Sequence, residues 1–158
     1  MREVHTEILI NAPRSAVWRV LLDMPGYNRW NPFLKFAGGK LEVGEFLRLD
    51  VHLPGAWVTP TRVQILKLNR ERELVWKGQF LNIPHLIDGY HSFLLFDLGE
   101  DRTKLVHQEH FKGFLLPFFF GWFTERKIKQ GMERMNPALK TEAEALTSNR
   151  SSGGGERL

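Results

Sequence analysis

Alternating apolar and polar positions predict β-strands along most of the chain. The first such segment, Glu3–Ile10, places every second side chain on one apolar face, which is the period of a half-buried strand. Turn-forming residues at Gly38-Gly39, Pro54-Gly55 and Gly99-Glu100-Asp101 separate further segments of this kind. These segments are Leu34–Ala37, Glu45–Leu53, Val58–Leu68, Glu73–Phe80, Gly89–Leu98 and Thr103–Phe111. Because short turns join consecutive strands, we expect antiparallel neighbours in a meander.

Helical periodicity is found after the first strand and near the C-terminus. Asn11 as a cap and Pro13 in the first turn predict a short helix that ends before Pro25-Gly26. The aromatic segment Tyr27–Phe33 is expected to form a helical turn or loop. A second apolar stripe, with spacings of four or three residues, predicts one long helix from about Pro117 to Leu146. Its members are Ile128, Met132, Met135, Leu139, Ala143 and Leu146.

The order of these elements predicts an α+β domain. A curved antiparallel sheet has one apolar face to bury and the last helix has one apolar stripe, so we expect them to pack together. This single domain is expected to span residues 1–146, and the Ser/Gly-rich tail 147–158 is expected to be disordered because it lacks periodicity.

Composition describes an ordinary globular domain and excludes several kinds of chemistry. The chain has 158 residues, of which 42% are hydrophobic and 25% charged. It has no cysteine, which excludes disulfides, thiolate nucleophiles and Cys-ligated zinc. The N-terminus has no signal-peptide core, and the longest apolar run, Phe114–Phe123, is shorter than the roughly 20 residues that a membrane span needs. We therefore expect a soluble, cytoplasmic protein.

The net charge of +4 does not predict a nucleic-acid binder. The basic residues are scattered, and their densest segment, Arg62–Lys77, also contains acidic residues and surrounds an expected hairpin turn. Nucleic-acid binders usually carry a basic stripe on one face. We expect no nucleic-acid partner.

A set of short motifs resembles the START-like (SRPBCC) superfamily, which has the helix-grip, or Bet v 1-like, fold. The motifs are Ala12-Pro13 with Val17-Trp18, Tyr27–Phe33, Val43–Glu45, Glu73–Gly78, Asp88–Phe93, Thr103–Gly113 and Met135–Lys140. Within the superfamily the chain is most similar to the polyketide cyclase/dehydrase and lipid-transport type. The resemblance implies a curved sheet wrapped around a long C-terminal helix, with an apolar cavity between them. Members range from lipid carriers and hormone receptors to cyclases and chaperone cofactors.

Two adjacent predicted strands concentrate ionisable residues among apolar ones. If a turn at Glu100 joins them, paired positions sum to about 200 and their side chains share one face. The pairs are then His91–Glu109, Phe93–His107 and Leu95–Leu105. A slip of one residue would instead set His91 opposite His110.

A contact between His91 and Glu109 has three interpretations. It can be a structural pair that satisfies two buried polar groups, a device that orients the polar end of a ligand, or an acid–base pair for proton transfer. A metal site of His91, His107 and Glu109 is supported by residue type alone. We expect neither a metal nor a cofactor.

Large apolar side chains of the predicted sheet, the long helix and two connecting segments are candidates for a cavity lining. They are Trp30, Trp57, Trp76, Phe80, Phe93, Phe111, Met132 and Met135. Together they offer adaptable apolar surface, with His91, Glu109 and His107 as the polar handles. Each of them alone is better explained as core than as cavity lining.

The run Phe114–Phe123 is apolar in every direction of a helix. It can pack on the open end of the sheet, form a lid over a cavity, or contact a membrane surface or partner protein, since basic residues follow it.

These observations leave three classes of function. The first is binding or transport of a hydrophobic or amphipathic small molecule, lipid-, polyketide- or isoprenoid-like, by a monomer or weak dimer. The second is a cofactor-independent polyketide cyclase or dehydratase that uses His91 and Glu109 as acid and base. The third is an interaction module, such as a chaperone cofactor or a ribosome- or membrane-associated factor.

Overall fold

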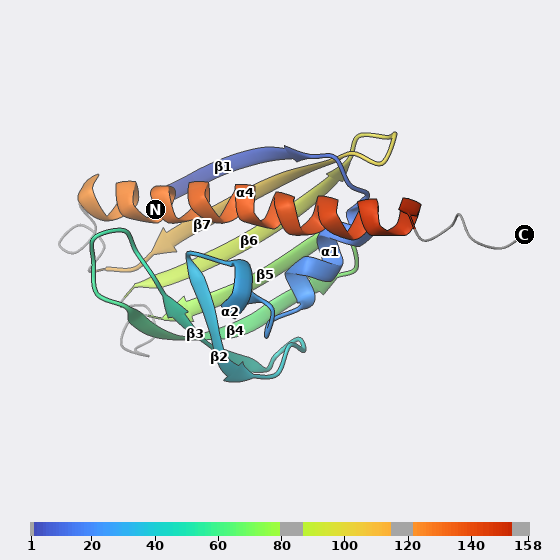
Figure 1. Cartoon of the computed structure of the whole chain (residues 1–158). Coiled ribbons are helices and arrows are strands. Elements are labelled where there is room, and N and C mark those ends of the chain that lie inside the picture. The colour runs from blue at the N-terminus through green and yellow to red at the C-terminus, as the bar shows by residue number, and fades with distance from the viewer. Residues whose placement is uncertain (1, 80–86, 115–121, 153–158) are drawn as a thin grey trace, which may run out of the picture.

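A curved antiparallel sheet wraps around one long helix (Figure 1). The computed structural model describes residues 2–79, 87–114 and 122–152. Within these residues the strands are β1 Arg2–Ile10, β2 Leu34–Gly39, β3 Phe46–Val51, β4 Thr59–Asn69, β5 Glu73–Gln79, β6 Asp88–Asp97 and β7 Thr103–Lys112. The helices are α1 Arg14–Leu22, α2 Tyr27–Trp30 and α4 Trp122–Ser152. The predicted α+β helix-grip fold is confirmed.

The sheet has the order β1-β7-β6-β5-β4-β3-β2, in which β2 to β7 form a meander and β1 pairs with the last strand, β7. All pairs are antiparallel. In the β6–β7 pair, His91 lies opposite Glu109 and Phe93 opposite His107. The predicted register is therefore confirmed.

The start of α1 differs from the expectation. Pro13 is its N-cap residue, and no side chain caps the helix. The Pro13 carbonyl accepts hydrogen bonds from the N–H groups of Ala16 and Val17. Asn11 lies two residues too early to cap, and its own N–H donates to Glu144 on α4 at 2.7 Å. The predicted Asn11 cap was wrong because Pro13, with its fixed φ, is already suited to begin the helix.

Helix α4 lies along the concave face of the sheet (Figure 1). Met132, Met135, Leu139 and Ala143 are fully buried, so the predicted apolar stripe is confirmed. Gly131 lets the helix approach closely, because a side-chain carbon there would overlap the Phe33 ring.

The C-terminal end of α4 extends further than expected. The helix continues to Ser152, past the boundary expected at residue 146. The Thr147 hydroxyl donates to the Ala143 carbonyl and the Ser148 hydroxyl to that of Glu144. Residues 147–152 are therefore helical where disorder was expected, and residues 153–158 lie outside the described part.

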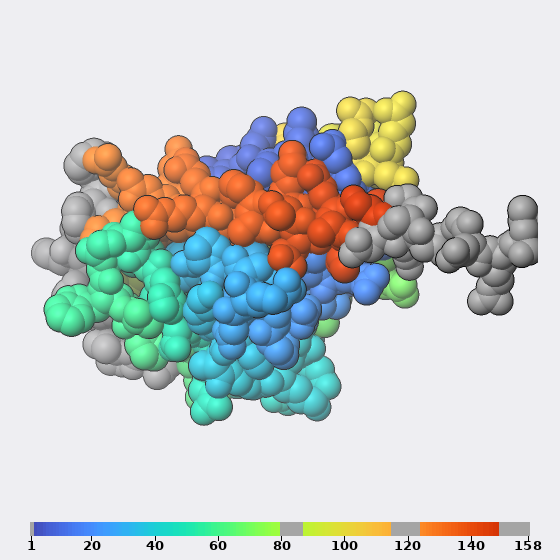
Figure 2. Space-filling view, in the orientation of Figure 1, coloured from blue at the N-terminus to red at the C-terminus, as the bar shows by residue number. Residues whose placement is uncertain are grey.

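The two ends of the concave face are covered differently. At one end α1 and α2 fill the space beneath the C-terminal half of α4 (Figure 2), where Arg29 pairs with Glu142 at 2.8 Å. At the other end the loop between β3 and β4 reaches α4 through a hydrogen bond from Lys127 Nζ to the Gly55 carbonyl oxygen. The core is packed at the first end, and the candidate site lies at the second.

Candidate functional site

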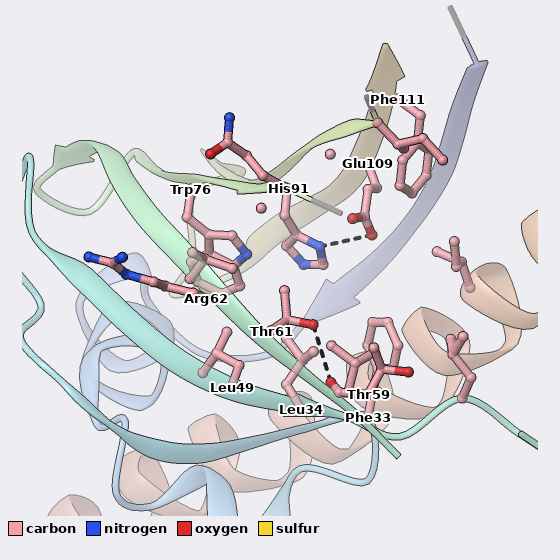
Figure 3. A pocket seen from close by; sticks show the side chains of 18 of the residues that line it. Phe33, Leu34, Leu49, Thr59, Thr61, Arg62, Trp76, His91, Glu109 and Phe111 are labelled. Atoms are coloured by element: carbon pink, nitrogen blue, oxygen red, sulfur yellow. Dashed lines mark hydrogen bonds and ion pairs between the residues drawn. The ribbon is translucent and has the colours of Figure 1, made fainter. Parts of the chain in front are cut away.

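A cavity of about 600 Å³ lies between the sheet and the first turns of α4 (Figure 3). Its walls come from the ends of β3, β5 and β7, the beginnings of β4 and β6, and Thr124 and Ile128 on α4. Phe33 closes one side. The Asn31 side-chain oxygen holds it there by accepting hydrogen bonds from the N–H groups of Phe33 and Leu34 at 2.9 and 3.0 Å. The volume is within the range of small-molecule sites.

Two glycines keep this space open. Gly78 on β5 and Gly89 on β6 lie opposite each other and both line the cavity. A side-chain carbon at Gly89 would lie 3.2 Å from both Glu109 Oε1 and the Phe111 ring. One at Gly78 would lie 3.4 Å from the Thr61 methyl group. The floor of the cavity thus lacks side chains at two neighbouring positions, where larger residues would fill it.

The predicted pair of His91 and Glu109 forms the polar part of the wall. His91 Nδ1 lies 3.1 Å from Glu109 Oε2, and the dashed line in Figure 3 marks this contact. The His91 ring stacks on Trp76, with centroids 5.0 Å apart and planes 8° apart. The Glu109 side chain is 17% exposed and that of His91 only 4%, so the carboxylate is the more accessible group.

Behind His91, the polar contacts continue into the core. His91 Nε2 lies 2.6 Å from His107 Nε2, and His107 Nδ1 lies 2.8 Å from Asn136 Oδ1. Burial lowers the pKa of His107 well below its ordinary value, the nearby His91 lowers it further, and the bond to Asn136 opposes the shift. His107 is therefore neutral at pH 7.

Comparison with known proteins assigns the chain to a family. Residues 1–144 match the family described as polyketide cyclase / dehydrase and lipid transport. The chain belongs to this family.

Solved structures of similar fold include an aromatase/cyclase. Zhui aromatase/cyclase from Streptomyces sp. R1128 has a TM-score of 0.74 at 21% identity, over 90% of this chain and 93% of that chain. A START superfamily protein from Mycobacterium smegmatis has a TM-score of 0.71 at 20% identity, over 91% of this chain and 98% of that chain. No curated protein matches the sequence. At these identities the solved structures show that the chain shares their fold.

The structure brings four of the predicted site residues to the cavity wall of this family member. They are Trp76, His91, Glu109 and Phe111. His107, Phe93, Met132 and Met135 are fully buried and lie in the core behind the wall. The same strand face carries both groups, so alternation alone does not separate cavity from core.

The remaining predicted lining residues lie elsewhere. Trp57 is 92% exposed, because it belongs to the loop before β4 rather than to the strand. Trp30 is partly buried against the core, with its ring edge-to-face with that of Tyr27 at 5.0 Å. Phe80 lies outside the described residues. Trp57 and Trp30 are not on the cavity wall.

Sequence reasoning missed part of the wall. Thr59, Thr61 and Val63 alternate along β4 and line the cavity, a pattern that the sequence displays. Gly78 and Gly89 belong to predicted strands, but the pattern does not indicate that they lie opposite each other on the cavity floor. Arg62 borders the cavity, but its guanidinium carbon lies 3.7 Å from the centre of the Phe46 ring, and Figure 3 shows the guanidinium directed away from His91.

The aromatic run is described only in part. Phe114 is 68% exposed, residues 115–121 lie outside the described part, and residues 122 and 123 begin α4. Its packing, lid and surface-contact interpretations remain predictions. Among the described helices, none is both long and apolar enough to cross a membrane. The described residues contain no group of three or more His, Asp or Glu side chains placed to hold a metal ion.

Proposed function

We propose that the protein binds a hydrophobic small molecule that carries a hydroxyl group, of the polyketide-like or aromatic kind, in the cavity above Gly78 and Gly89. The observation that carries this proposal is one partly exposed carboxylate, Glu109, on an otherwise largely apolar wall. Apolar walls with a few placed polar groups are typical of small-molecule sites. A carboxylate only accepts hydrogen bonds, so Glu109 favours a ligand with a hydroxyl donor.

A matched set of bicyclic probes tests the proposal. We expect 2-naphthol to bind more tightly than 2-methoxynaphthalene, which has the same rings and oxygen but no donor. A hydrogen bond to a charged group contributes about 1.5–3 kcal/mol, which is roughly a ten- to hundredfold difference in Kd. Fluorescence titration of the purified protein measures both constants. Glu109→Gln should reduce the difference, and equal affinities in the wild type would contradict the assignment.

A catalytic function is the second candidate, favoured by the contact between His91 and Glu109 at the cavity wall. An imidazole and a carboxylate together can take a proton from a carbon next to a carbonyl and deliver one to a departing hydroxyl. The net change is loss of water, with no redox partner required. Cyclase and dehydrase chemistry is also part of the family's description.

A small β-hydroxyketone tests this candidate. The probe 3-hydroxy-1-tetralone loses water to become 1-naphthol, whose fluorescence reports the reaction. A catalytic pair should accelerate the reaction above buffer, and His91→Gln and Glu109→Gln should each remove most of the acceleration. A rate equal to that in buffer, with 2-naphthol still bound, would leave binding alone as the function.

A further inference from the structure

A buried row of polar side chains connects the cavity to strand β1. From Glu109 the row passes through His91, His107 and Asn136 to Thr6, where Asn136 Nδ2 lies 3.0 Å from Thr6 Oγ1. Thr6 is 8% exposed, Asn136 and His91 are 3% exposed, and His107 is fully buried. We call these five side chains the polar row. Since Thr6, Asn136, His107 and His91 have little access to water, their side-chain hydrogens must be satisfied within the protein.

The contact between the two imidazoles links the tautomers of His91 and His107. A neutral imidazole carries one N–H, on either Nδ1 or Nε2. The contact joins two Nε2 atoms, so one ring must donate there and the other must accept. The hydrogen bonds of the polar row can run in either of two directions, which differ in the atom that donates in each contact. In the structure, Asn136 Oδ1 faces His107 Nδ1, and an amide oxygen only accepts. His107 therefore carries its hydrogen on Nδ1, and His91 donates from Nε2.

This direction requires an additional proton at the cavity. With its hydrogen on Nε2, a neutral His91 would present a bare Nδ1 to the Glu109 carboxylate, and two acceptors would face each other at 3.1 Å. A proton between them resolves the conflict, either as an imidazolium or as a protonated carboxyl group. The pair of His91 and Glu109 is then loaded with one proton.

The opposite direction needs no additional proton. If the Asn136 amide turns over, its nitrogen donates to His107 Nδ1. His107 then donates from Nε2 to His91, and His91 donates from Nδ1 to Glu109. The Thr6 hydroxyl accepts from Asn136 Nδ2 and donates to the His107 carbonyl at 3.4 Å. In the opposite direction it can turn to donate to the Asn136 amide oxygen, because a hydroxyl both donates and accepts. The two directions of the polar row therefore differ by one proton at the cavity wall.

We propose that Asn136 is a positioning residue: its amide direction selects the tautomer of His107 and thereby determines whether the pair of His91 and Glu109 holds an additional proton. The loaded pair offers a proton to a ligand, and the unloaded pair offers a bare carboxylate. The inference rests on the proposed function only where it states that this pair contacts the ligand.

The surroundings of the row place the proton at its cavity end. Burial keeps the pKa of His107 far below its ordinary value, so His107 changes tautomer without becoming charged. Among the described residues, Glu109 is the one charged side chain that bonds to another member of the row. Other ionisable groups border a shallow hollow beside Thr6 and Asn136; they are His5, Glu7, Lys129 and Glu133.

Nitrogen NMR of the ligand-free protein tests the inference directly. Ring ¹⁵N shifts distinguish Nδ1–H, Nε2–H and doubly protonated histidine, and a series from about pH 5 to 9 covers histidine titration. We expect His107 to stay neutral and to move from Nε2–H to Nδ1–H as the pH falls, while His91 moves from Nδ1–H to a form that carries Nε2–H. A His107 tautomer that stays constant across the series would overturn the inference, as would a His91 that never carries Nε2–H.

Two variants of Asn136 separate positioning from packing. Asn136→Asp, as an ionised carboxylate, presents only acceptors to His107 and should hold the His107 hydrogen on Nδ1 throughout the series. Asn136→Leu has a similar size but no acceptor, and should hold that hydrogen on Nε2, where His91 accepts it. A role in packing alone would leave the His107 tautomer of both variants as in the wild type, which contradicts the inference. The wild-type series remains decisive if a variant does not fold, and since no ligand is present, its result is independent of naphthol binding.

Discussion

Filling the cavity from Gly78 should strengthen the fold and weaken ligand binding at the same time. Gly78 lies in β5 with no positive φ, so a β-branched residue suits its backbone. The first added carbon would lie 3.4 Å from Thr61 Cγ2 and 3.5 Å from Val63 Cγ1, which are ordinary contacts. Gly78→Val therefore adds apolar atoms to the cavity without displacing its walls.

The expected magnitudes follow from burial and overlap. Replacing a strand glycine contributes about 0.5–1 kcal/mol, and cavity filling commonly contributes about 0.5–2 kcal/mol. We expect a rise of roughly 1–2 kcal/mol in the free energy of unfolding, or about 2–8 °C in Tm for a domain of this size. A bound ligand must give up the same space, and overpacking costs about 1–3 kcal/mol. Its Kd should therefore rise roughly five- to a hundredfold.

Urea denaturation and 2-naphthol titration measure the two effects on one sample. Ser92→Val is the matched control, because Ser92 lies on β6 at a position that alternates away from His91 and does not line the cavity. The control should leave the Kd unchanged. A more stable Gly78→Val protein with unaltered affinity would mean that the ligand does not occupy the space above this glycine. A destabilised protein would mean that the space is not open.

Four further substitutions test the packing around the site and the charge state of His107. Gly131→Ala would gain about 1 kcal/mol in an exposed helix, but here it should cost about 1–3 kcal/mol because the methyl group overlaps Phe33; any gain in urea denaturation would contradict this packing. Phe93→Ala should cost about 3–5 kcal/mol, since Phe93 is fully buried, whereas Trp57→Ser should change stability by less than about 0.5 kcal/mol. Burial keeps His107 neutral in the folded protein, whereas the unfolded chain binds a proton there at low pH. As the pH falls below about 6.5, the free energy of unfolding should therefore decrease by up to about 1.4 kcal/mol per pH unit. His107→Gln should flatten this dependence, and equal slopes for the variant and the wild type would refute it.

The β6–β7 register could be predicted because one short turn determines it. With Glu100 at the turn, the pairing of His91 with Glu109 follows from position alone. The pairing of Gly78 with Gly89 lies across residues 80–86, whose course the sequence does not reveal. The open floor of the cavity therefore could not be inferred, although both glycines are visible in the sequence.

To separate cavity residues from core residues, one must know how far along its strand each residue lies beneath helix α4. The alternation of apolar and polar positions does not give this information. Phe93 and His107 have the same parity as His91 and Glu109, and they face the same side. The deeper pair is sealed by the packed part of α4, where Met132 and Met135 are fully buried. The shallower pair borders the space below Thr124 and Ile128. Only the position of the helix over the sheet makes this distinction.

The polar pair lies at the boundary between packed core and cavity, and this position explains its chemistry. Successive cross-strand pairs of β6 and β7 run from Leu95–Leu105 through Phe93–His107 and His91–Glu109 to Gly89–Phe111. A histidine at the third position has its inner nitrogen satisfied by the core and its outer nitrogen by a carboxylate that remains partly exposed. Moved one pair inward, the carboxylate would lose its access to water and to a ligand, at a high cost for a buried charge. Moved one pair outward, it would lose the support of His107 and Asn136. At this position the core holds His91 and Glu109 in a single geometry while the carboxylate stays accessible to a ligand.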